Sequence, residues 1–269
     1  MSRSTIAWAL NGRTVLSGVG EKSFSFKNGN SGQTTNLKIS ITTPEGDTVV
    51  KNQSWTPVGV NLLWEANTYT PPFYKGKHLM SPQADVRVIA VPDSSINTLT
   101  AGNYVYNWKK DGYVLADFSG YSKNIFNFTG PKPYALLKIG VEISGFNGTA
   151  RSETSLNIMQ TTPFILFYEN NPLMGTLYNK ALGSNVVITR KEFSVSAEPY
   201  FFSVERSENI YEGYEWSLNN KGVENSSHLI TLRNNQNTSG VSKLALSVRG
   251  ITKTFQNASQ AVMINFKAE

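Results

Sequence analysis

Two histidines, His78 and His228, are the only histidines in the sequence, so a histidine-based reaction would have to use one of them. A serine hydrolase would place such a base beside a nucleophilic serine, yet the sequence holds no Gly-x-Ser-x-Gly turn. Neither histidine has a metal-ligand neighbour at a useful spacing. We therefore expect both to be surface or loop residues.

Carboxylates are sparse, with 19 Asp and Glu residues in 269. No EF-hand spacing is present, which argues against a calcium site of that kind. A glycosidase needs two carboxylates that meet in space. Glu65 and Glu169 recur at matching positions of the repeat described below, and a recurring residue in a repeat more often serves the fold than a reaction. We expect no catalytic residue, no metal site and no cofactor.

The segment Tyr69-Thr70-Pro71-Pro72-Phe73-Tyr74 is the best candidate contact site. Aromatic rings beside proline on a loop can stack on sugars or hold a protein partner. The same rings would also serve to cover a junction between consecutive domains. Tyr69, Phe73 and Tyr74 are thus expected to make contacts, with ligand binding and junction packing as the two alternatives.

Charge and composition exclude several classes of protein. The net charge of +6 is modest, and the basic residues are scattered instead of forming the clustered face that nucleic-acid binding requires. Cysteine is absent, which rules out disulfides and thiolate metal sites. No run of about 18 apolar residues is present, so we expect no membrane span, and the start of the chain lacks a signal-peptide core.

Three tryptophans are each followed by a pair of turn residues: Trp8 by Asn11-Gly12, Trp108 by Asp111-Gly112, and Trp216 by Asn219-Asn220. Their spacings of 100 and 108 residues match the length of one small β-sandwich domain. Asn-Gly and Asp-Gly supply the positive φ that a type I′ hairpin turn needs. We expect each tryptophan to fill the core of one repeat.

Alternating apolar residues follow each tryptophan at similar distances. Each repeat has an alternating pair and then an alternating triplet: Phe24 and Phe26, then Leu37, Ile39 and Ile41; Phe126 and Phe128, then Leu137, Ile139 and Val141; Ile230 and Leu232, then Leu244, Leu246 and Val248. Alternation at period two, broken by turns every 8–12 residues, predicts an all-β sandwich. The predicted domains are a C-terminal half-sandwich over 1–57, a sandwich over 58–161 and a sandwich over 162–269.

The first unit contains the tryptophan block but lacks the strands that precede it in the other two. A half-sandwich exposes its inner face and its unpaired edges, which is unfavourable. We expect either that the sequence is a fragment whose missing N-terminal strands come from upstream sequence, or that a partner completes this unit.

The aromatic-x-Trp-x-x-[Asp/Asn]-[Gly/Asn] segments and their flanking strands resemble the tandem immunoglobulin-like or PKD-like repeats of bacterial cell-surface proteins. The resemblance covers nearly the whole chain. It implies a non-enzymatic protein of the cell envelope or extracellular surface, working as a spacer, adhesion or assembly module, with a protein or glycan partner and no nucleic acid. The alternatives are a carbohydrate-binding module that uses Tyr69, Phe73 and Tyr74, and accessory domains of a larger enzyme.

Overall fold

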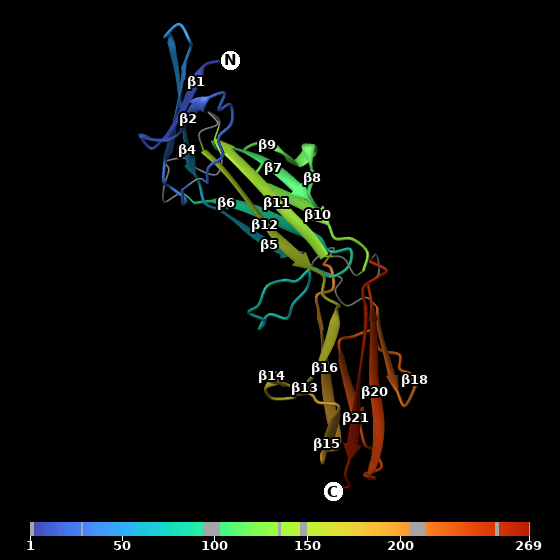
Figure 1. Cartoon of the computed structure of the whole chain (residues 1–269). Coiled ribbons are helices and arrows are strands. Elements are labelled where there is room, and N and C mark those ends of the chain that lie inside the picture. The colour runs from blue at the N-terminus through green and yellow to red at the C-terminus, as the bar shows by residue number, and fades with distance from the viewer. Residues whose placement is uncertain are drawn as a thin grey trace. The chain divides into compact units, whose positions relative to one another are not determined.

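The computed structural model of the chain describes residues 3–27, 29–93, 103–133, 136–145, 150–204, 213–250 and 253–268 (Figure 1). Within these ranges the regular structure is β-strand, apart from one short 3₁₀ helix, η2 (Ala116–Phe118). The predicted all-β fold of immunoglobulin-like sandwich repeats, the first of them incomplete, is confirmed.

Contacts between residues divide the chain into two compact units. Unit 1 comprises Met1–Leu63, Val88–Phe126 and Leu137–Asn157, and unit 2 comprises Trp64–Arg87, Asn127–Leu136 and Ile158–Glu269. This division cuts across strands of the second repeat. The repeat boundaries at 57/58 and 161/162 therefore stay a prediction, and the repeats below are named by sequence.

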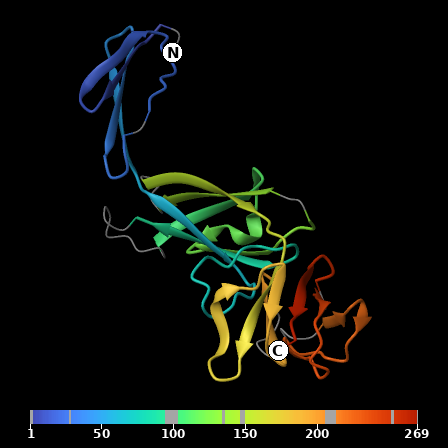
Figure 2. The same cartoon turned by 90° about the horizontal axis from the view of Figure 1, so that it is seen from below.

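The third repeat, within unit 2, is a two-sheet sandwich. Its first sheet has the order β14 (Gly175–Ala181), β13 (Phe164–Asn171), β16 (Glu192–Tyr200), β19 (Leu229–Arg233). Its second sheet has the order β15 (Asn185–Ile188), β21 (Asn257–Phe266), β20 (Gly240–Arg249), β17 (Tyr214–Leu218), β18 (Lys221–Gly222). In Figure 2 the yellow strands of the first sheet and the red strands of the second sheet lie in separate layers.

This strand order is that of an immunoglobulin-type sandwich, in which β13, β16 and β19 take the places of strands A, B and E, and β17, β20 and β21 take those of C, F and G. Alternate residues of both sheets face a common buried core, which includes Phe167, Val195, Trp216, Leu246 and Ile264. Burial of these side chains is what holds the two sheets together, since the chain has no disulfide.

The second repeat has the same strand order as the third. Strands β10 (Ile125–Thr129), β6 (Asp85–Pro92) and β5 (Val60–Ala66) form a three-stranded sheet. Strands β12 (Ala150–Met159), β11 (Leu136–Gly145), β7 (Tyr104–Lys110) and β8 (Tyr113–Val114) lie next to one another in a second sheet, where β9 (Gly120–Tyr121) also pairs with β7.

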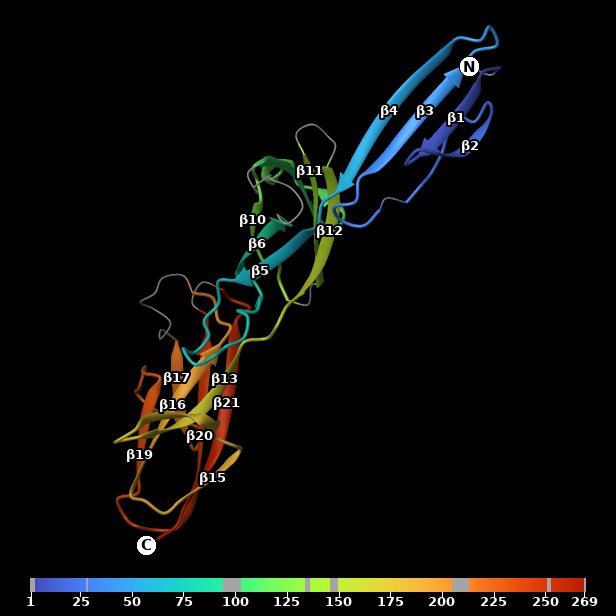
Figure 3. The same cartoon turned by 90° about the vertical axis from the view of Figure 1, so that its left-hand side faces the viewer.

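The first repeat has one sheet, with the order β2 (Arg13–Val19), β1 (Thr5–Leu10), β3 (Thr35–Thr42), β4 (Thr48–Pro57). These strands match C′, C, F and G of the other repeats, and the end of β4 pairs in parallel with the start of β12. Among the described residues before β4 ends, no strand matches A or B, and the segment between β2 and β3 forms no strand (Figure 3).

All three predicted hairpin turns are confirmed as the type I′ form. Both central residues have positive φ in each turn: Asn11 and Gly12, Asp111 and Gly112, Asn219 and Asn220. Each turn is also fixed to the start of the neighbouring F-type strand. The side-chain oxygens of Asn11, Asp111 and Asn219 accept hydrogen bonds from the amides of Asn36 (2.8 Å), Lys138 (2.9 Å) and Lys243 (2.8 Å).

The predicted alignment of the apolar triplets is wrong by two residues in the second repeat. Trp8 pairs with Ile39 and Trp216 with Leu246, but Trp108 pairs with Val141, not with Ile139. The equivalent triplet of the second repeat is therefore Ile139, Val141 and Ile143. The sequence pattern could not show this shift, because moving a strand by two residues preserves its alternation.

Candidate interaction surfaces

Each tryptophan of the repeat donates its indole N–H to one backbone carbonyl. The Nε1 atoms of Trp8, Trp108 and Trp216 lie 2.9, 2.8 and 2.8 Å from the carbonyl oxygens of Glu21, Lys123 and Ser227, which are 13, 15 and 11 residues further along the chain. Three residues after each acceptor comes an equivalent inward-facing apolar residue, Phe24, Phe126 or Ile230. This bond thus fixes the C-type strand to the E-type segment in all three repeats.

The three tryptophans differ in burial. Trp108 and Trp216 are 0% and 2% exposed, and their rings lie against Phe126 (5.6 Å between centroids) and Phe167 (5.5 Å). Trp8 is only half-buried, and its ring contacts Phe24 at 5.9 Å. Trp8 therefore occupies the core position of its repeat without the full cover that the other two receive.

Burial also affects the tyrosine that shares a strand with Trp108. Desolvation raises the pKa of Tyr106 to about 12, with a smaller contribution from Tyr104. Since the neutral phenol is the form that this core holds, Tyr106 stabilises the fold below pH 10 and this contribution is lost as the pH rises towards 12.

The inner face of the β1–β4 sheet is an apolar surface with partial cover. Ile39 and Ile41 are half-buried, whereas their equivalents Val141, Ile143, Leu246 and Val248 are at most 3% exposed. Val49, which pairs with Ile41, is 64% exposed. An aromatic row crosses this face, with centroid separations of 5.9 Å from Trp8 to Phe24, 5.9 Å from Phe24 to Phe26 and 5.6 Å from Phe26 to Trp55.

The candidate contact residues lie at a junction inside unit 2. Tyr69, Phe73 and Tyr74 belong to the segment 67–84, which contacts the outer face of β13 and β16 of the third repeat. Phe73 stacks on Tyr178 at 4.3 Å and meets the edge of Tyr168 at 5.7 Å. All three candidate residues are half-buried.

Tyr74 and Tyr69 complete this aromatic junction. Tyr74 meets Tyr200 and Phe201 edge to face at 5.9 and 5.8 Å. The carboxylate of Glu198, which is 5% exposed, accepts hydrogen bonds from the hydroxyls of Tyr69 (3.3 Å) and Tyr178 (3.0 Å). Burial, followed by the hydrogen bond with Tyr168, raises the pKa of the Tyr200 hydroxyl.

Main-chain bonds fix the same segment to the third repeat. The amide of Tyr69 donates to the carbonyl of Phe202, and the amide of Phe201 donates to the carbonyl of Tyr69, both at 2.7 Å. Gln256, 1% exposed, donates to the Pro82 carbonyl (2.6 Å) and the Ser203 hydroxyl (2.7 Å) and accepts from the Ser203 amide (2.7 Å). The junction is thus built from backbone pairing, ring contacts and a buried amide.

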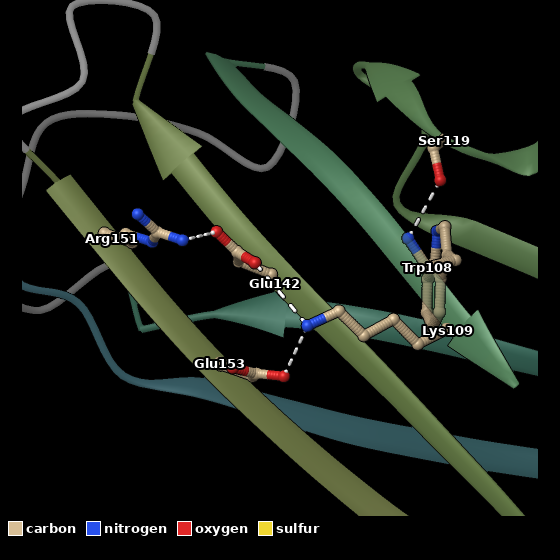
Figure 4. Close-up of polar contacts among 6 residues, drawn as sticks. All are labelled: Trp108, Lys109, Ser119, Glu142, Arg151 and Glu153. Atoms are coloured by element: carbon tan, nitrogen blue, oxygen red, sulfur yellow. Dashed lines mark hydrogen bonds and ion pairs between the residues drawn. The ribbon is translucent and has the colours of Figure 1, made fainter. Parts of the chain in front are cut away.

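A charged network covers part of the β7–β11–β12 sheet in unit 1 (Figure 4). Lys109 Nζ lies 2.7 Å from a carboxylate oxygen of Glu153 and 3.6 Å from one of Glu142, which also pairs with Arg151. The hydrogen bond with Glu153 raises the pKa of Lys109. In the same figure the amide of Trp108 donates to the Ser119 hydroxyl at 2.9 Å, which fixes the loop after β8 to the tryptophan strand.

Of the residues considered for catalysis, His78 and Glu65 line one groove, whereas His228 and Glu169 are not part of its lining. His78 is exposed and its Nδ1 bonds the Thr68 carbonyl (2.7 Å), and with Glu65 it lines a groove of about 610 Å³ in unit 2. His228 lies in a loop before β19, and Glu169 forms an ion pair with Arg190 at 2.7 Å. Across the described ranges, no group of three His, Cys, Asp or Glu side chains is arranged to hold a metal ion.

Sequence reasoning missed the bonds that recur in every repeat. The indole-to-carbonyl bond and the turn-to-strand bond each join a side chain to a backbone group, so their partners carry no residue signature. The carbonyl that accepts the indole bond always lies three residues before the next inward-facing apolar residue. This constant spacing can be recognised only once the accepting carbonyl is known.

No family model and no curated protein matches the sequence. Solved structures give partial matches. The fibronectin(III)-like modules of CbhA from Clostridium thermocellum are 10% identical over 76% of this chain and 94% of that one, with a TM-score of 0.26. SGBP-B of the Bacteroides ovatus mixed-linkage glucan utilization locus, in complex with a heptasaccharide, is 13% identical over 98% of this chain and 60% of that one, with a TM-score of 0.24.

A third match is a 1.5-MDa bacterial ice-binding adhesin, 9% identical over 99% of this chain and 87% of that one, with a TM-score of 0.26. The fold assignment rests on the strand order of the chain itself. In the part of the chain that the structure describes, no helix is long and apolar enough to cross a membrane.

Proposed function

We propose that this chain is a non-enzymatic protein of a bacterial envelope or cell surface, whose immunoglobulin-like repeats serve as spacer and assembly modules. The observation that carries the proposal is the junction in unit 2, where the segment 67–84 covers the outer face of the third repeat. Ser196, Glu198 and Tyr200 of β16 are buried there although they point away from the sandwich core. A junction of this kind supports an assembly role, because it holds the segment 67–84 in one position on the third repeat.

The same contacts bear on the choice between junction packing and carbohydrate binding. A sugar-binding aromatic ring needs an open face on which the pyranose ring can lie. Phe73 instead stacks on Tyr178, and Tyr74 meets Tyr200 and Phe201. These contacts support junction packing as the role of Tyr69, Phe73 and Tyr74.

The junction can be tested with spin labels, because the chain has no cysteine of its own. We expect labels at Lys75→Cys and Lys191→Cys to give a narrow distance distribution in electron double resonance. The double variant Phe73→Ser/Tyr74→Ser should broaden it at least twofold, since it removes the ring contacts. The control Leu173→Ser/Met174→Ser, at residues that are 97% and 76% exposed, should leave it narrow. An equally broad distribution in the unaltered chain would contradict a fixed position of the segment 67–84 on the third repeat.

The location can be tested in the native cells. We expect an antibody against residues 162–269 to detect the protein in the envelope or the medium after fractionation. A band confined to the soluble cytosolic fraction would overturn the surface assignment and leave the junction result untouched.

A further inference from the structure

The second repeat carries a groove on the outer face of its three-stranded sheet, on the side away from the sandwich core. The groove has a volume of about 610 Å³ and lies within unit 2. Val86 and Phe126 are buried in the core, so the residues between the core positions of β6 and β10 point outward. The outward side chains that line the groove are Glu65, Asp85, Arg87, Asn127 and Thr129.

Two opposite charges in this groove, Glu65 and Arg87, form no ion pair with another described residue. The repeat makes the contrast direct, because Glu65 is equivalent to Glu169, which does pair with an arginine. The groove therefore holds a carboxylate and a guanidinium that are available to a ligand. The other described arginines of the second and third repeats each pair with a glutamate: Arg151 with Glu142, Arg190 with Glu169, Arg233 with Glu192 and Arg249 with Glu215.

Hydrogen bonds orient two further side chains of the groove. The Thr129 hydroxyl donates to Oδ1 of Asp85 at 2.7 Å, which leaves Oδ2 of this carboxylate for another donor. Nδ1 of His78 donates to the Thr68 carbonyl at 2.7 Å, because a carbonyl can only accept, and Nε2 lies 3.4 Å from the Thr70 hydroxyl. Polar groups whose positions are set before a ligand arrives lose little freedom when it binds.

We infer that this groove binds a neutral oligosaccharide. A sugar hydroxyl both donates and accepts hydrogen bonds, so it needs acceptors and donors close together. The groove offers acceptors at Glu65 and Asp85 and donors at Arg87 and the Asn127 amide. Its volume lies within the range of about 300–1,000 Å³ that small-molecule sites occupy. The inference concerns other residues than the aromatic junction and does not rest on the proposed function.

The charge of the lining is the reason for expecting a neutral ligand. Two carboxylates, Glu65 and Asp85, face the one guanidinium of Arg87 in the groove. An acidic sugar would therefore meet an excess of negative charge there, although the chain as a whole has a net charge of +6. Binding in the groove thus favours a neutral sugar, whereas nonspecific attraction to the chain favours an acidic one.

Titration of the full chain, followed by nuclear magnetic resonance, tests the inference. The probes are hexasaccharides of glucose, mannose and galactose, each with its uronic acid counterpart. We expect a neutral hexasaccharide to shift the side-chain signals of Arg87 and Asn127 and to bind more tightly than its acidic counterpart. The variant Glu65→Ala/Arg87→Ala should weaken this binding about tenfold or more, since it removes two charged hydrogen-bonding groups.

The matched control is Glu215→Ala/Arg249→Ala, which removes the same two side-chain types from exposed positions of the third repeat. It should leave the affinity unchanged. Equal weakening by both double variants, tighter binding of the uronic acid hexamers, or no binding of any neutral hexasaccharide at millimolar concentration would each overturn the inference. So would stronger binding of triglycine, because the two charges would then serve the ends of a peptide. None of these outcomes bears on the junction or the location of the protein.

Discussion

Replacing Trp216 with alanine is expected to lower the free energy of unfolding of the third repeat by about 3–5 kcal/mol. The indole is 2% exposed and lies between the sheets, in contact with Phe167. Its removal leaves a cavity and also leaves the Ser227 carbonyl without its donor. Hydrogen exchange of the β20 and β21 amides should report this loss for that repeat alone.

The matched control is Trp8→Ala, the same change at the equivalent position of the first repeat. Trp8 is half-buried, and the described residues form no sheet opposite its own, so less apolar surface and packing are lost. We expect a cost below about 2 kcal/mol, measured from the β1 and β3 amides. Equal losses in both variants would show that the first repeat is as well packed as the third.

Replacing Gln256 with leucine is expected to cost about 3 kcal/mol and to release the segment 67–84 from the third repeat. Leucine fills a similar volume but satisfies none of the three groups that the amide bonds. The buried Pro82 carbonyl and the partly buried Ser203 amide would be left without these partners. Removing the side-chain amide leaves its partners without hydrogen bonds, and each then costs its full desolvation free energy. We therefore expect a larger loss of stability than for replacement of a glutamine on the surface.

The variant Gln256→Glu distinguishes the acceptor role of the Gln256 side chain from its donor role. The carboxylate can still accept from the Ser203 amide, but it cannot donate to the Pro82 carbonyl and places negative charge beside it. We expect this variant to be as unstable as the leucine variant. Urea unfolding and proteolytic cleavage within 67–84 measure the two effects, and a variant as stable and as resistant as the natural chain would contradict the assigned role.

The sequence predicted the strands and turns of the fold better than the contacts that they make with one another. Alternation located Trp216 and Leu246 on strands that face one core, and Asn11-Gly12 located a turn with two positive φ values. Both signals are local, since they depend on side-chain period and on backbone sterics. The absence of A- and B-type strands from the first repeat was also predictable, from comparison of one repeat with the next.

The junction and the register of the second repeat could not be derived in the same way. Tyr69 and Phe73 were recognised as contact residues, but their partners Glu198 and Tyr178 lie more than 100 residues away and carry no shared pattern. The longer connection after Trp108 moved the register by two residues, and alternation is blind to a shift of that size.

The parallel pairing of β15 with β21 in the third repeat has a mechanical consequence. The chain enters β15 at one end of the paired region and leaves β21 at the opposite end, because Asn185 is opposite Met263 and Ile188 is opposite Phe266. A pull that reaches the start of β15 and the end of β21 therefore acts along these two strands. It loads their hydrogen bonds in shear, all together, instead of opening them one at a time. The pairing of β15 with β21 is thus expected to resist tension along the polypeptide.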